Sequence, residues 1–316
     1  MSLAEAAPAP TVMAGPSPAV RARALTKVYS GDQAALAGLD LDVGRGEVFG
    51  FLGPNGAGKT TAVKLLVGLV RPTSGEALVL GAPMGDIDAR RRIGYLPETF
   101  RYQSWLSAAE VVEYHHRLLG LPRPGRADQV RALLRRVGLA SRAGDRVSRF
   151  SKGMQQRLGL AVALVGDPEI VFLDEPTSAL DPVGRHEVRG LIRELRDEGR
   201  SVFLNTHLLD EAQQVCDRVA IVDHGRTLAT GRLPELLGSR HRLRVRVDGV
   251  GDAGWDGLAR FGPWTHEGGW SETTGVAPDD VPALVASLVA AGGRVHAVVP
   301  TTVNLEERFL QILGES

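Results

Sequence analysis

The feature that most constrains this chain is a glycine-rich segment between two apolar runs. Its residues are Gly53, Pro54, Asn55, Gly56, Ala57, Gly58, Lys59, Thr60 and Thr61. They fit the pattern of a phosphate-binding P-loop, which is Gly, any four residues, and then Gly-Lys-Thr. Residues 48–52 before the segment form a short apolar run typical of a buried strand, and residues 59–70 carry apolar side chains at helical spacing. We therefore predict a strand, a phosphate-binding loop and a helix in succession.

Each residue type in this loop has a physical reason. Glycines allow backbone N–H groups to turn inward around a β-phosphate, and the N-terminus of the following helix adds the positive end of its dipole. Lys59 brings a positive charge to the β- and γ-phosphates, and the Thr60 hydroxyl can ligate Mg²⁺. A chance glycine-rich turn is the alternative, but the flanking strand and helix favour a site for a nucleoside triphosphate.

The composition is that of a globular protein and argues against several classes of function. Of the 316 residues, 43% are hydrophobic and 23% are charged, which suits one large domain or two moderate ones. Lys plus Arg and Asp plus Glu both number 37, so no excess of positive charge supports nucleic-acid binding. Cys216 is the single cysteine, which suits the cytosol because no disulfide can form within the chain. Because no apolar run reaches the ~18 residues of a membrane span and no signal peptide is recognisable, we expect a cytoplasmic protein.

Three regions of the chain differ in pattern. Residues 1–20 are rich in Ala and Pro without periodicity, which predicts a disordered tail. Residues 21–239 predict an α/β domain with a parallel sheet core, a small antiparallel β-subdomain before the P-loop and an inserted helical subdomain. Within that helical block, Ser107 and Glu110 have the spacing of a capping box that opens a helix. Residues 240–316 predict a small α+β C-terminal accessory domain without chemical motifs.

Two apolar runs end in polar side chains that suit phosphate chemistry. Asp174 and Glu175 close the run 169–175. Beside a P-loop, such an Asp holds Mg²⁺, and the Glu that follows can accept a proton from the attacking water. A solvated strand end is the alternative for the two carboxylates, and the P-loop upstream disfavours it. His207 also ends a strand and can hydrogen-bond a γ-phosphate, although alone it is better interpreted as an ordinary core or surface histidine. Tyr29, at the end of another short run, could stack on a purine or be an ordinary strand aromatic.

In their order, these motifs resemble those of the ATP-binding subunits of ABC transporters. The matching segments are residues 53–61 (Walker A), 150–157 (signature), 170–175 (Walker B), 178–181 (D-loop) and His207 (H-loop). The resemblance covers roughly residues 20–239, and the joint pattern is highly specific although its single pieces are not. It implies that Tyr29 stacks on adenine and that Glu98 occupies the Q-loop position beside the metal. Our candidate catalytic residues are Lys59, Glu175 and His207, and our candidate metal ligands are Thr60, Glu98 and Asp174.

The resemblance also implies a composite ATP site that is shared by two copies of the chain. Ser151, at the N-terminus of a helix in one copy, would close with Gly153 on the γ-phosphate held by the P-loop of the other copy. That role is physically reasonable because a helix N-terminus attracts anions.

Two departures from the family pattern point to a branch of it. The usual signature is Leu-Ser-Gly-Gly-Gln, whereas residues 150–154 read Phe-Ser-Lys-Gly-Met and keep the Ser and the second Gly. Glu98 stands where the family has Gln, and a carboxylate can ligate Mg²⁺ but donates no hydrogen bond. Both departures, and residues 305–309 near the end, resemble the branch that serves drug-efflux and ABC-2-type permeases.

We therefore predict a subunit on the inner face of the cell membrane that hydrolyses ATP to drive a separate integral-membrane permease, with export favoured over import. Phe100, Tyr102 and Trp105 mark a candidate docking surface for the permease, or else a loop that packs on its own core. A soluble ABC ATPase acting on ribosomes or DNA is the alternative class. The single P-loop, the neutral charge and the lack of long coiled coils or zinc modules disfavour it. A regulatory module without hydrolysis is disfavoured because the candidate catalytic residues are all retained.

Overall fold

A computed structural model describes residues 17–29, 34–237, 242–301 and 305–314. The contacts between Cα atoms divide the chain into two compact units, with the division between Thr227 and Leu228. Most of the residues of the predicted disordered tail lie outside the described residues. The domain boundary that we expect near residue 240 stays a prediction.

The first unit begins with a small antiparallel sheet. Its strands, in the order β2-β1-β4-β5, are β1 (Val20–Val28), β2 (Ala34–Val43), β4 (Ser74–Val79) and β5 (Ala82–Pro83). Buried residues alternate with exposed ones along β4 and along the end of β2, so one face of the sheet packs against the core. This sheet is the predicted β-subdomain, but only β1 and β2 precede the P-loop, since β4 and β5 join the sheet from the segment after α1.

The second sheet is the core of the first unit. Its strands, in the order β10-β9-β3-β8-β7-β6, are β3 (Val48–Leu52), β6 (Ile93–Leu96), β7 (Ile170–Asp174), β8 (Ser201–Thr206), β9 (Arg218–Asp223) and β10 (Arg226–Arg232). The pairs β9/β3, β3/β8, β8/β7 and β7/β6 are parallel. Every residue of β3, β7 and β8 is buried, because a parallel sheet is covered on both faces. The carboxyl ends of β3, β7 and β8 therefore meet at one edge.

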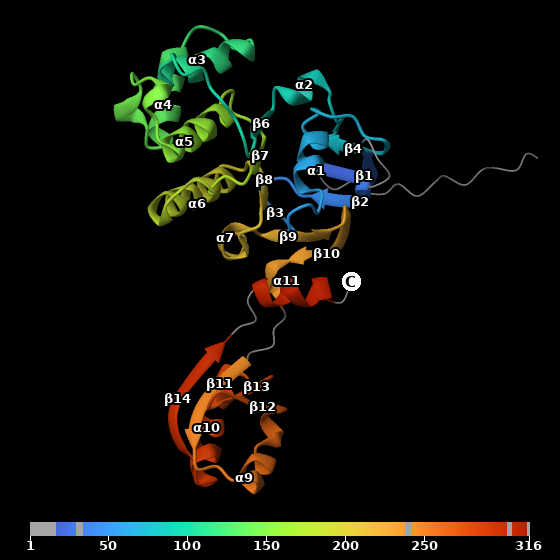
Figure 1. The fold of residues 1–316 in the computed structure, drawn as a ribbon, viewed down its shortest axis with the longest axis vertical. Coiled ribbons are helices and arrows are strands. Elements are labelled where there is room, and N and C mark those ends of the chain that lie inside the picture. Colours follow the sequence, from blue (N-terminus) through green and yellow to red (C-terminus); the bar gives the residue numbers. More distant parts are fainter. Residues whose placement is uncertain (1–16, 30–33, 238–241, 302–304, 315–316) are drawn as a thin grey trace, which may run out of the picture. The chain divides into compact units, whose positions relative to one another are not determined.

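Helices cover this sheet and build the helical subdomain. They are α1 (Lys59–Leu66), α2 (Ile87–Arg90), α3 (Ala108–Leu118), α4 (Arg126–Arg136), α5 (Lys152–Ala163), α6 (Pro182–Asp197) and α7 (Leu209–Val215), with 3₁₀ turns η1 (Ala140–Arg142) and η2 (Val147–Arg149). In Figure 1, α3, α4 and α5 lie together, on the side of the central strands that faces away from the antiparallel sheet. The capping box at the start of α3 is present as predicted.

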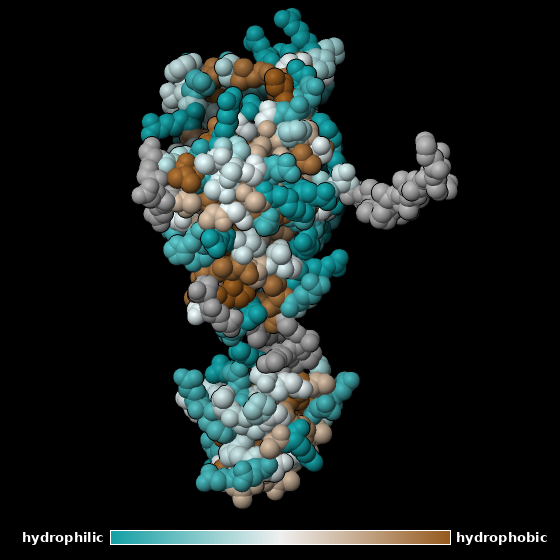
Figure 2. Space-filling view, turned by 90° about the vertical axis from the view of Figure 1, so that its right-hand side faces the viewer, coloured by the Kyte–Doolittle hydropathy of each residue, from teal (hydrophilic) through white to brown (hydrophobic). Residues whose placement is uncertain are grey.

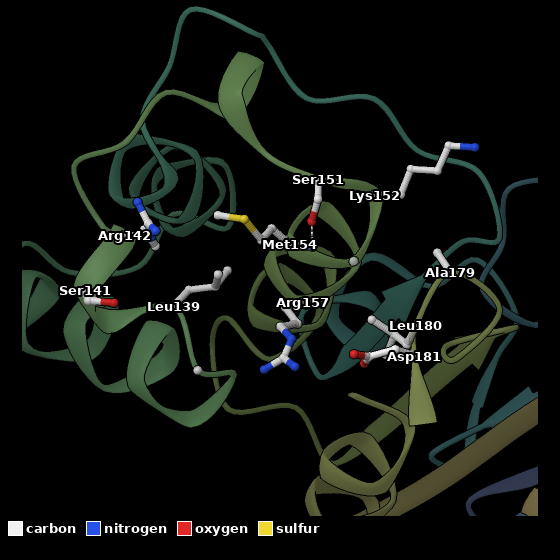
Figure 3. A pocket seen from close by; sticks show the side chains of 12 residues that line it. Leu139, Ser141, Arg142, Ser151, Lys152, Met154, Arg157, Ala179, Leu180 and Asp181 are labelled. Carbon is white, nitrogen blue, oxygen red and sulfur yellow. Dashed lines mark hydrogen bonds between the residues drawn. The ribbon is translucent and has the colours of Figure 1, made fainter. Parts of the chain in front are cut away.

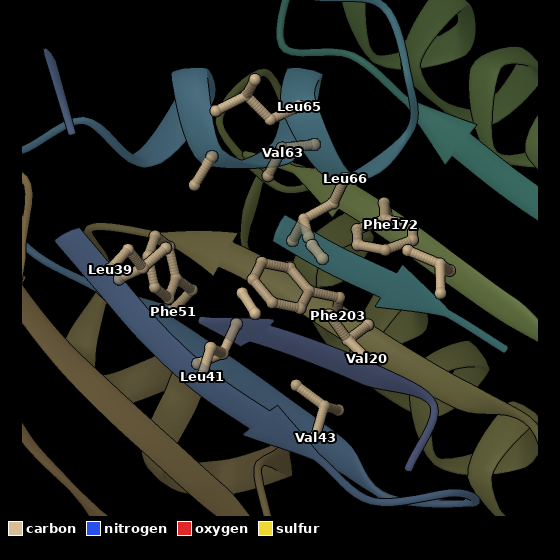
Figure 4. Packing of buried hydrophobic residues seen from close by; sticks show 14 of the residues in the cluster. Val20, Leu39, Leu41, Val43, Phe51, Val63, Leu65, Leu66, Phe172 and Phe203 are labelled. Carbon is tan, nitrogen blue, oxygen red and sulfur yellow. The ribbon is translucent and has the colours of Figure 1, made fainter. Parts of the chain in front are cut away.

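The hydrophobic core joins the two sheets through α1. Phe49, Phe51 and Phe172 each pack against the ring of Phe203, with ring centroids 5.2–5.9 Å apart. Figure 4 shows side chains from α1 and from both sheets, including these phenylalanines, meeting in one cluster. The cluster holds the P-loop rigidly between β3 and α1, because both of its flanking elements are part of the core.

The second unit has its own sheet and its own core. The elements are α8 (Leu233–Leu237), β11 (Arg242–Asp248), α9 (Asp252–Gly257), η3 (Ala259–Phe261), β12 (Trp264–Glu267), β13 (Trp270–Thr274), η4 (Pro278–Asp280), α10 (Val281–Ala290), β14 (Arg294–Thr301) and α11 (Leu305–Gly314). The antiparallel strand order is β12-β13-β11-β14. Its core includes Leu243 and Val245 on β11 together with Leu284 and Leu288 on α10. The predicted α+β character of this region is confirmed.

The predicted fold class is confirmed, and the differences lie at element ends and in short elements. The helix after the P-loop ends at Leu66 rather than near Val70, because Gly68 adopts a left-handed conformation with φ +72°. Strand β10, helix α7 and the pair β12 and β13 are present in the structure but were not predicted.

The surface in Figure 2 mixes hydrophilic residues with scattered groups of hydrophobic ones. Among the large hydrophobic side chains, Trp105 is 68% exposed and Ile87 is 69% exposed. None of the described helices is both long enough and apolar enough to cross a membrane.

Candidate functional site

The P-loop connects β3 to α1 in a conformation that only glycine tolerates at two positions. Gly56 and Gly58 have φ angles of +85° and +93°, in the left-handed region. A Cβ atom on Gly58 would lie 2.2 Å from the carbonyl oxygen of Ala35, so no larger residue fits there. The loop can therefore turn its backbone around a bound group, as a phosphate site requires.

Lys59 is the first residue of α1, and its ammonium group folds back over the loop. Its Nζ donates hydrogen bonds to the carbonyl oxygens of Gly53 at 2.8 Å and Pro54 at 3.1 Å. Burial lowers the pKa of Lys59, while the negative charges of Glu175 and Asp174 act in the opposite direction. Because the side chain is 7% exposed, the positive charge is concentrated at the loop and not in solvent.

Asp174 ends β7 and is completely buried beside Asn205, which lies opposite it on β8. The amide of Asn205 donates a short hydrogen bond to Oδ1 of Asp174, and Oδ2 has no hydrogen-bond partner among the described residues. Burial raises the pKa of Asp174 to about 6, and the carboxylates of Glu98 and Glu175 act in the same direction. The Asn205 hydrogen bond and the charge of Lys59 oppose that rise. A buried carboxylate oxygen without a partner is a suitable ligand for a cation or for water bound to one.

Glu175 follows Asp174 and has its carboxylate fixed against the end of β8. Its Oε1 accepts hydrogen bonds from the backbone N–H of His207 at 3.1 Å and lies 2.8 Å from His207 Nδ1. Its backbone has φ +50°, which is unusual for a residue with a side chain and marks a strained position. The carboxylate and the imidazole therefore form one unit, in which the His207 side chain is about half exposed.

A cavity of about 400 Å³ brings most of the predicted site residues together. It is lined by Ala35, Asn55, Gly56, Gly58, Lys59, Thr60, Thr61, Glu98, Glu175, Ser178, Asn205 and His207. These residues come from β2, from the P-loop and the start of α1, from the end of β8, and from the loops that follow β6, β7 and β8. Asp174 lies behind this lining, through its contact with Asn205. The cavity thus presents a cation, a carboxylate–histidine pair and a hydroxyl to one volume.

The signature residues lie around a different cavity, of about 570 Å³. Figure 3 shows its lining, which comes from the segment around Leu139 and Arg142, from Ser151 and the first turns of α5, and from the loop 179–181 before α6. Ser151 caps α5, because its hydroxyl accepts a hydrogen bond from the N–H of Met154 at 3.2 Å. The Lys152 side chain extends away from Leu139 and Ser141 in this view. The exposed N-terminus of α5 therefore faces outward rather than toward the P-loop of the same chain.

Tyr29 lines neither of these two cavities. It follows β1 and is 48% exposed, with the Lys27 ammonium 5.1 Å from its ring centroid. Residues 30–33 after it lie outside the described residues. Its role in stacking on adenine stays a prediction.

Two residues of the site were not predicted from the sequence. Asn205 holds Asp174, and Gln156 of α5 donates hydrogen bonds to backbone carbonyl groups at the end of β7. A polar residue at the end of the apolar run 201–204 was a signal for Asn205. No sequence signal distinguishes Gln156 from its neighbour Gln155.

The residues present fit a bound Mg²⁺ with a nucleotide. Asp174 offers an unpartnered buried oxygen, and Thr60 and Glu98 line the adjacent cavity. No group of three or more His, Cys, Asp or Glu side chains suited to a metal occurs among the described residues. A magnesium ion here would therefore take its other ligands from phosphate oxygens and water, as it prefers to do.

The comparison with known proteins decides the family. A family model described as ABC transporter matches residues 36–178. A fluoroquinolones export ATP-binding protein of Mycobacterium tuberculosis is 42% identical over 298 residues, which cover 93% of each chain. A Nod factor export ATP-binding protein of Cupriavidus metallidurans is 36% identical over 92% of this chain and 96% of its own length. The chain belongs to the ATP-binding proteins of ABC transporters.

A solved ABC structure agrees with the fold of the first unit. An ATP-binding cassette described as a dimer in a post-hydrolysis state, bound to ADP and Pi, matches with a TM-score of 0.63 and 27% identity. The match covers 68% of this chain and 98% of that chain. This ABC protein is therefore an ATPase, and the two cavities are candidate parts of its ATP site.

Proposed function

We propose that this ABC protein is the subunit that hydrolyses ATP to power a separate integral-membrane permease in export. Two copies would close around two ATP molecules on the inner face of the membrane. The observation that carries the proposal is the separation of the two cavities within one chain. Lys59 and Glu175 line one of them, while Ser151 and Gly153 line the other.

This separation supports a site built from two copies. The N-terminus of α5 carries the exposed residue Ser151 and attracts anions, yet it is absent from the lining of the P-loop cavity of its own chain. A second copy, turned by a two-fold axis, can present its α5 to the phosphates held by the first, and the exchange is reciprocal. The solved relative described as a dimeric post-hydrolysis state is consistent with this arrangement.

The geometry supports a proposed role for several residues in and beside the P-loop cavity. Lys59 and the backbone N–H groups of the loop would hold the phosphates, and Thr60, Asp174 and Glu98 would hold Mg²⁺, which neutralises phosphate charge when bound. Glu175 would accept a proton from the attacking water. At the same time, the oxygen of that water would bond to the γ-phosphorus, and the bond between the γ-phosphorus and ADP would break. His207 contacts this carboxylate through Nδ1, and its half-exposed ring lines the cavity that would hold the γ-phosphate.

Export and a permease partner are supported by the named relatives and by one part of the surface. Two relatives carry export in their names. Trp105 is 68% exposed in the segment after Glu98, where an exposed indole is a common anchor for a partner protein. Phe100 and Tyr102 are more buried and stack on each other with ring centroids 5.2 Å apart, so they support this segment from beneath. We infer that Trp105 is the permease-facing member of the three.

The Glu175→Gln variant tests the proposal. The substitution is nearly isosteric and keeps the P-loop contacts, so the variant should bind ATP but lose a factor of ~10²–10⁴ in turnover, which is typical of a missing general base. Closed dimers could then not reopen through ATP hydrolysis and would accumulate. Size-exclusion chromatography with Mg-ATP should show a dimer, alone or with the permease, and the same protein with ADP should not.

Two results bear on different parts of the proposal. A Glu175→Gln protein that hydrolyses ATP at the wild-type rate would remove Glu175 from the role of general base. An inactive variant that stays monomeric with Mg-ATP, even when it is purified with its permease, would exclude the ATP-closed dimer.

A further inference from the structure

Gln156 connects the signature helix to the end of the Walker B strand. The residue lies on α5 and is 4% exposed. Its side-chain Nε2 donates hydrogen bonds to the carbonyl oxygens of Pro176 at 3.0 Å and Glu175 at 3.4 Å. Because both acceptors follow β7, one buried side chain joins the helix that begins at Ser151 to the residue proposed as general base.

The backbone that Gln156 contacts is the strained one. Glu175 has φ +50°, a conformation that persists only when its surroundings hold it. Its N–H donates to the carbonyl oxygen of Asn205 at 2.9 Å, and its carbonyl oxygen also accepts from the N–H and the hydroxyl of Ser178. For the carbonyl of Pro176, the Gln156 amide is the single hydrogen-bond donor recorded among the described residues. Gln156 thus adds two contacts to the backbone from which the Glu175 side chain projects.

The same helix also touches the loop that lines the signature cavity. A Cβ atom added to Gly153 would lie 3.3 Å from the Leu180 side chain, so the start of α5 and the D-loop are in close contact. A displacement of α5 when its N-terminus receives a phosphate would therefore reach Glu175 through Gln156. No other side-chain hydrogen bond recorded among the described residues joins α5 to the peptide units of Glu175 and Pro176.

We propose that Gln156 is a positioning residue that aligns Glu175 for hydrolysis and couples this alignment to the occupancy of the signature helix. The inference rests on the proposed function, since it acts through Glu175 as general base. Gln156 is absent from the residues that line the P-loop cavity. Its loss should therefore lower kcat and leave the binding of ATP unchanged.

The test compares steady-state and single-turnover ATPase rates of the full chain for Gln156→Met and Gln156→Glu. Methionine keeps the length but has no donor, and glutamate keeps the shape but presents acceptor oxygens to two carbonyl groups. Each should lower kcat by about tenfold or more, as small misplacements of a catalytic group do, with KM for ATP within about twofold of wild type. Gln129→Met on α4 is the matched control, and it should keep the wild-type kcat. Thermal unfolding shows whether each variant is folded. If one of the two substitutions at position 156 prevents folding, the other provides the test.

A double variant separates positioning from general destabilisation. In the Glu175→Gln background, Gln156→Met should cause no further loss of the single-turnover rate, because the group it positions is already gone. A wild-type kcat in folded Gln156→Met, or losses that multiply in the double variant, would overturn the role of Gln156. Wild-type turnover in Glu175→Gln alone would instead overturn the proposed function, so the two failures are distinguishable.

Discussion

At the scale of single residues, Lys59 concentrates most of the binding chemistry in one side chain. The residue is 7% exposed, and its ammonium group is held by the carbonyl groups of Gly53 and Pro54. Lys59→Ala removes the cation nearest to the phosphates, so the variant should bind ATP weakly and show no measurable turnover. Lys64→Ala, on the exposed face of the same helix, is the control and should behave as wild type. Isothermal titration with ATP and a phosphate-release assay measure both effects, and wild-type turnover in Lys59→Ala would exclude this residue from the site.

The residues that the sequence identifies are those that stand in contiguous motifs. The P-loop and the Asp174-Glu175 pair are contiguous in the chain, so their spacing alone indicates their chemistry. Asn205 and Gln156 act across the fold, because the first depends on the register between β7 and β8 and the second on how α5 lies beside the residues that follow β7. Neither relation follows from a single sequence, since each depends on which elements become neighbours in the fold.

At the scale of elements, the capping box of α3 is a local device whose contribution can be measured. The Ser107 hydroxyl accepts from the N–H of Glu110 at 3.3 Å, and the Glu110 carboxylate accepts from the N–H and the hydroxyl of Ser107 at 2.8 Å. Ser107→Ala should lower the free energy of unfolding by about 1 kcal/mol, as the loss of an N-cap usually does. Ser104→Ala, at an exposed position nearby, is the control and should change it little. Urea unfolding followed by circular dichroism measures both.

The same box has a defined pH dependence. The hydrogen bonds from the Ser107 N–H and hydroxyl lower the pKa of Glu110. The contribution of the ionised Glu110 to the free energy of unfolding is therefore fully present above the pKa of an unfolded glutamate, which is about 4. This contribution is lost as the pH falls through the lower pKa of Glu110 in the folded state. The difference between wild type and Ser107→Ala should shrink in acid, and a difference that grows there would contradict this assignment.

Elements with a strong periodic pattern were predictable, and those with a weak one were not. The strands β3, β7 and β8 are continuous apolar runs, whereas β10 reads Arg-Thr-Leu-Ala-Thr-Gly-Arg at the edge of the sheet and has little apolar surface to bury. The strands β12 and β13 did leave a signal in their connection. Gly268 and Gly269 both have positive φ, as a two-residue hairpin turn requires, and a Gly-Gly pair between short runs is typical of such a hairpin.

At the scale of the whole molecule, the second unit is a compact body with its own core. None of the residues that line the two cavities lies beyond residue 207. Within this unit, the C-terminal helix α11 packs against α8, with Leu233 and Leu305 both buried. The unit therefore suits a role in assembly or regulation more than one in the chemistry of ATP.

Deletion of residues 240–316 should leave ATP binding intact and alter assembly with the second copy or with the permease. The truncated chain keeps every residue that lines the two cavities and all six strands of the central sheet. Its affinity for ATP should therefore stay within about twofold of wild type. A tenfold change in affinity would correspond to about 1.4 kcal/mol of binding free energy. A second truncation after Arg232 also removes α8 and keeps β10, and it should bind ATP equally well.

Circular dichroism verifies folding, titration with a fluorescent ATP analogue measures affinity, and full-length Lys59→Ala is the binding-deficient reference. A truncated protein that folds but does not bind ATP would show that the accessory domain is part of the nucleotide site and that the boundary near residue 240 is wrong. Unchanged assembly with both partners in a folded, ATP-binding truncation would remove the assembly role from this domain.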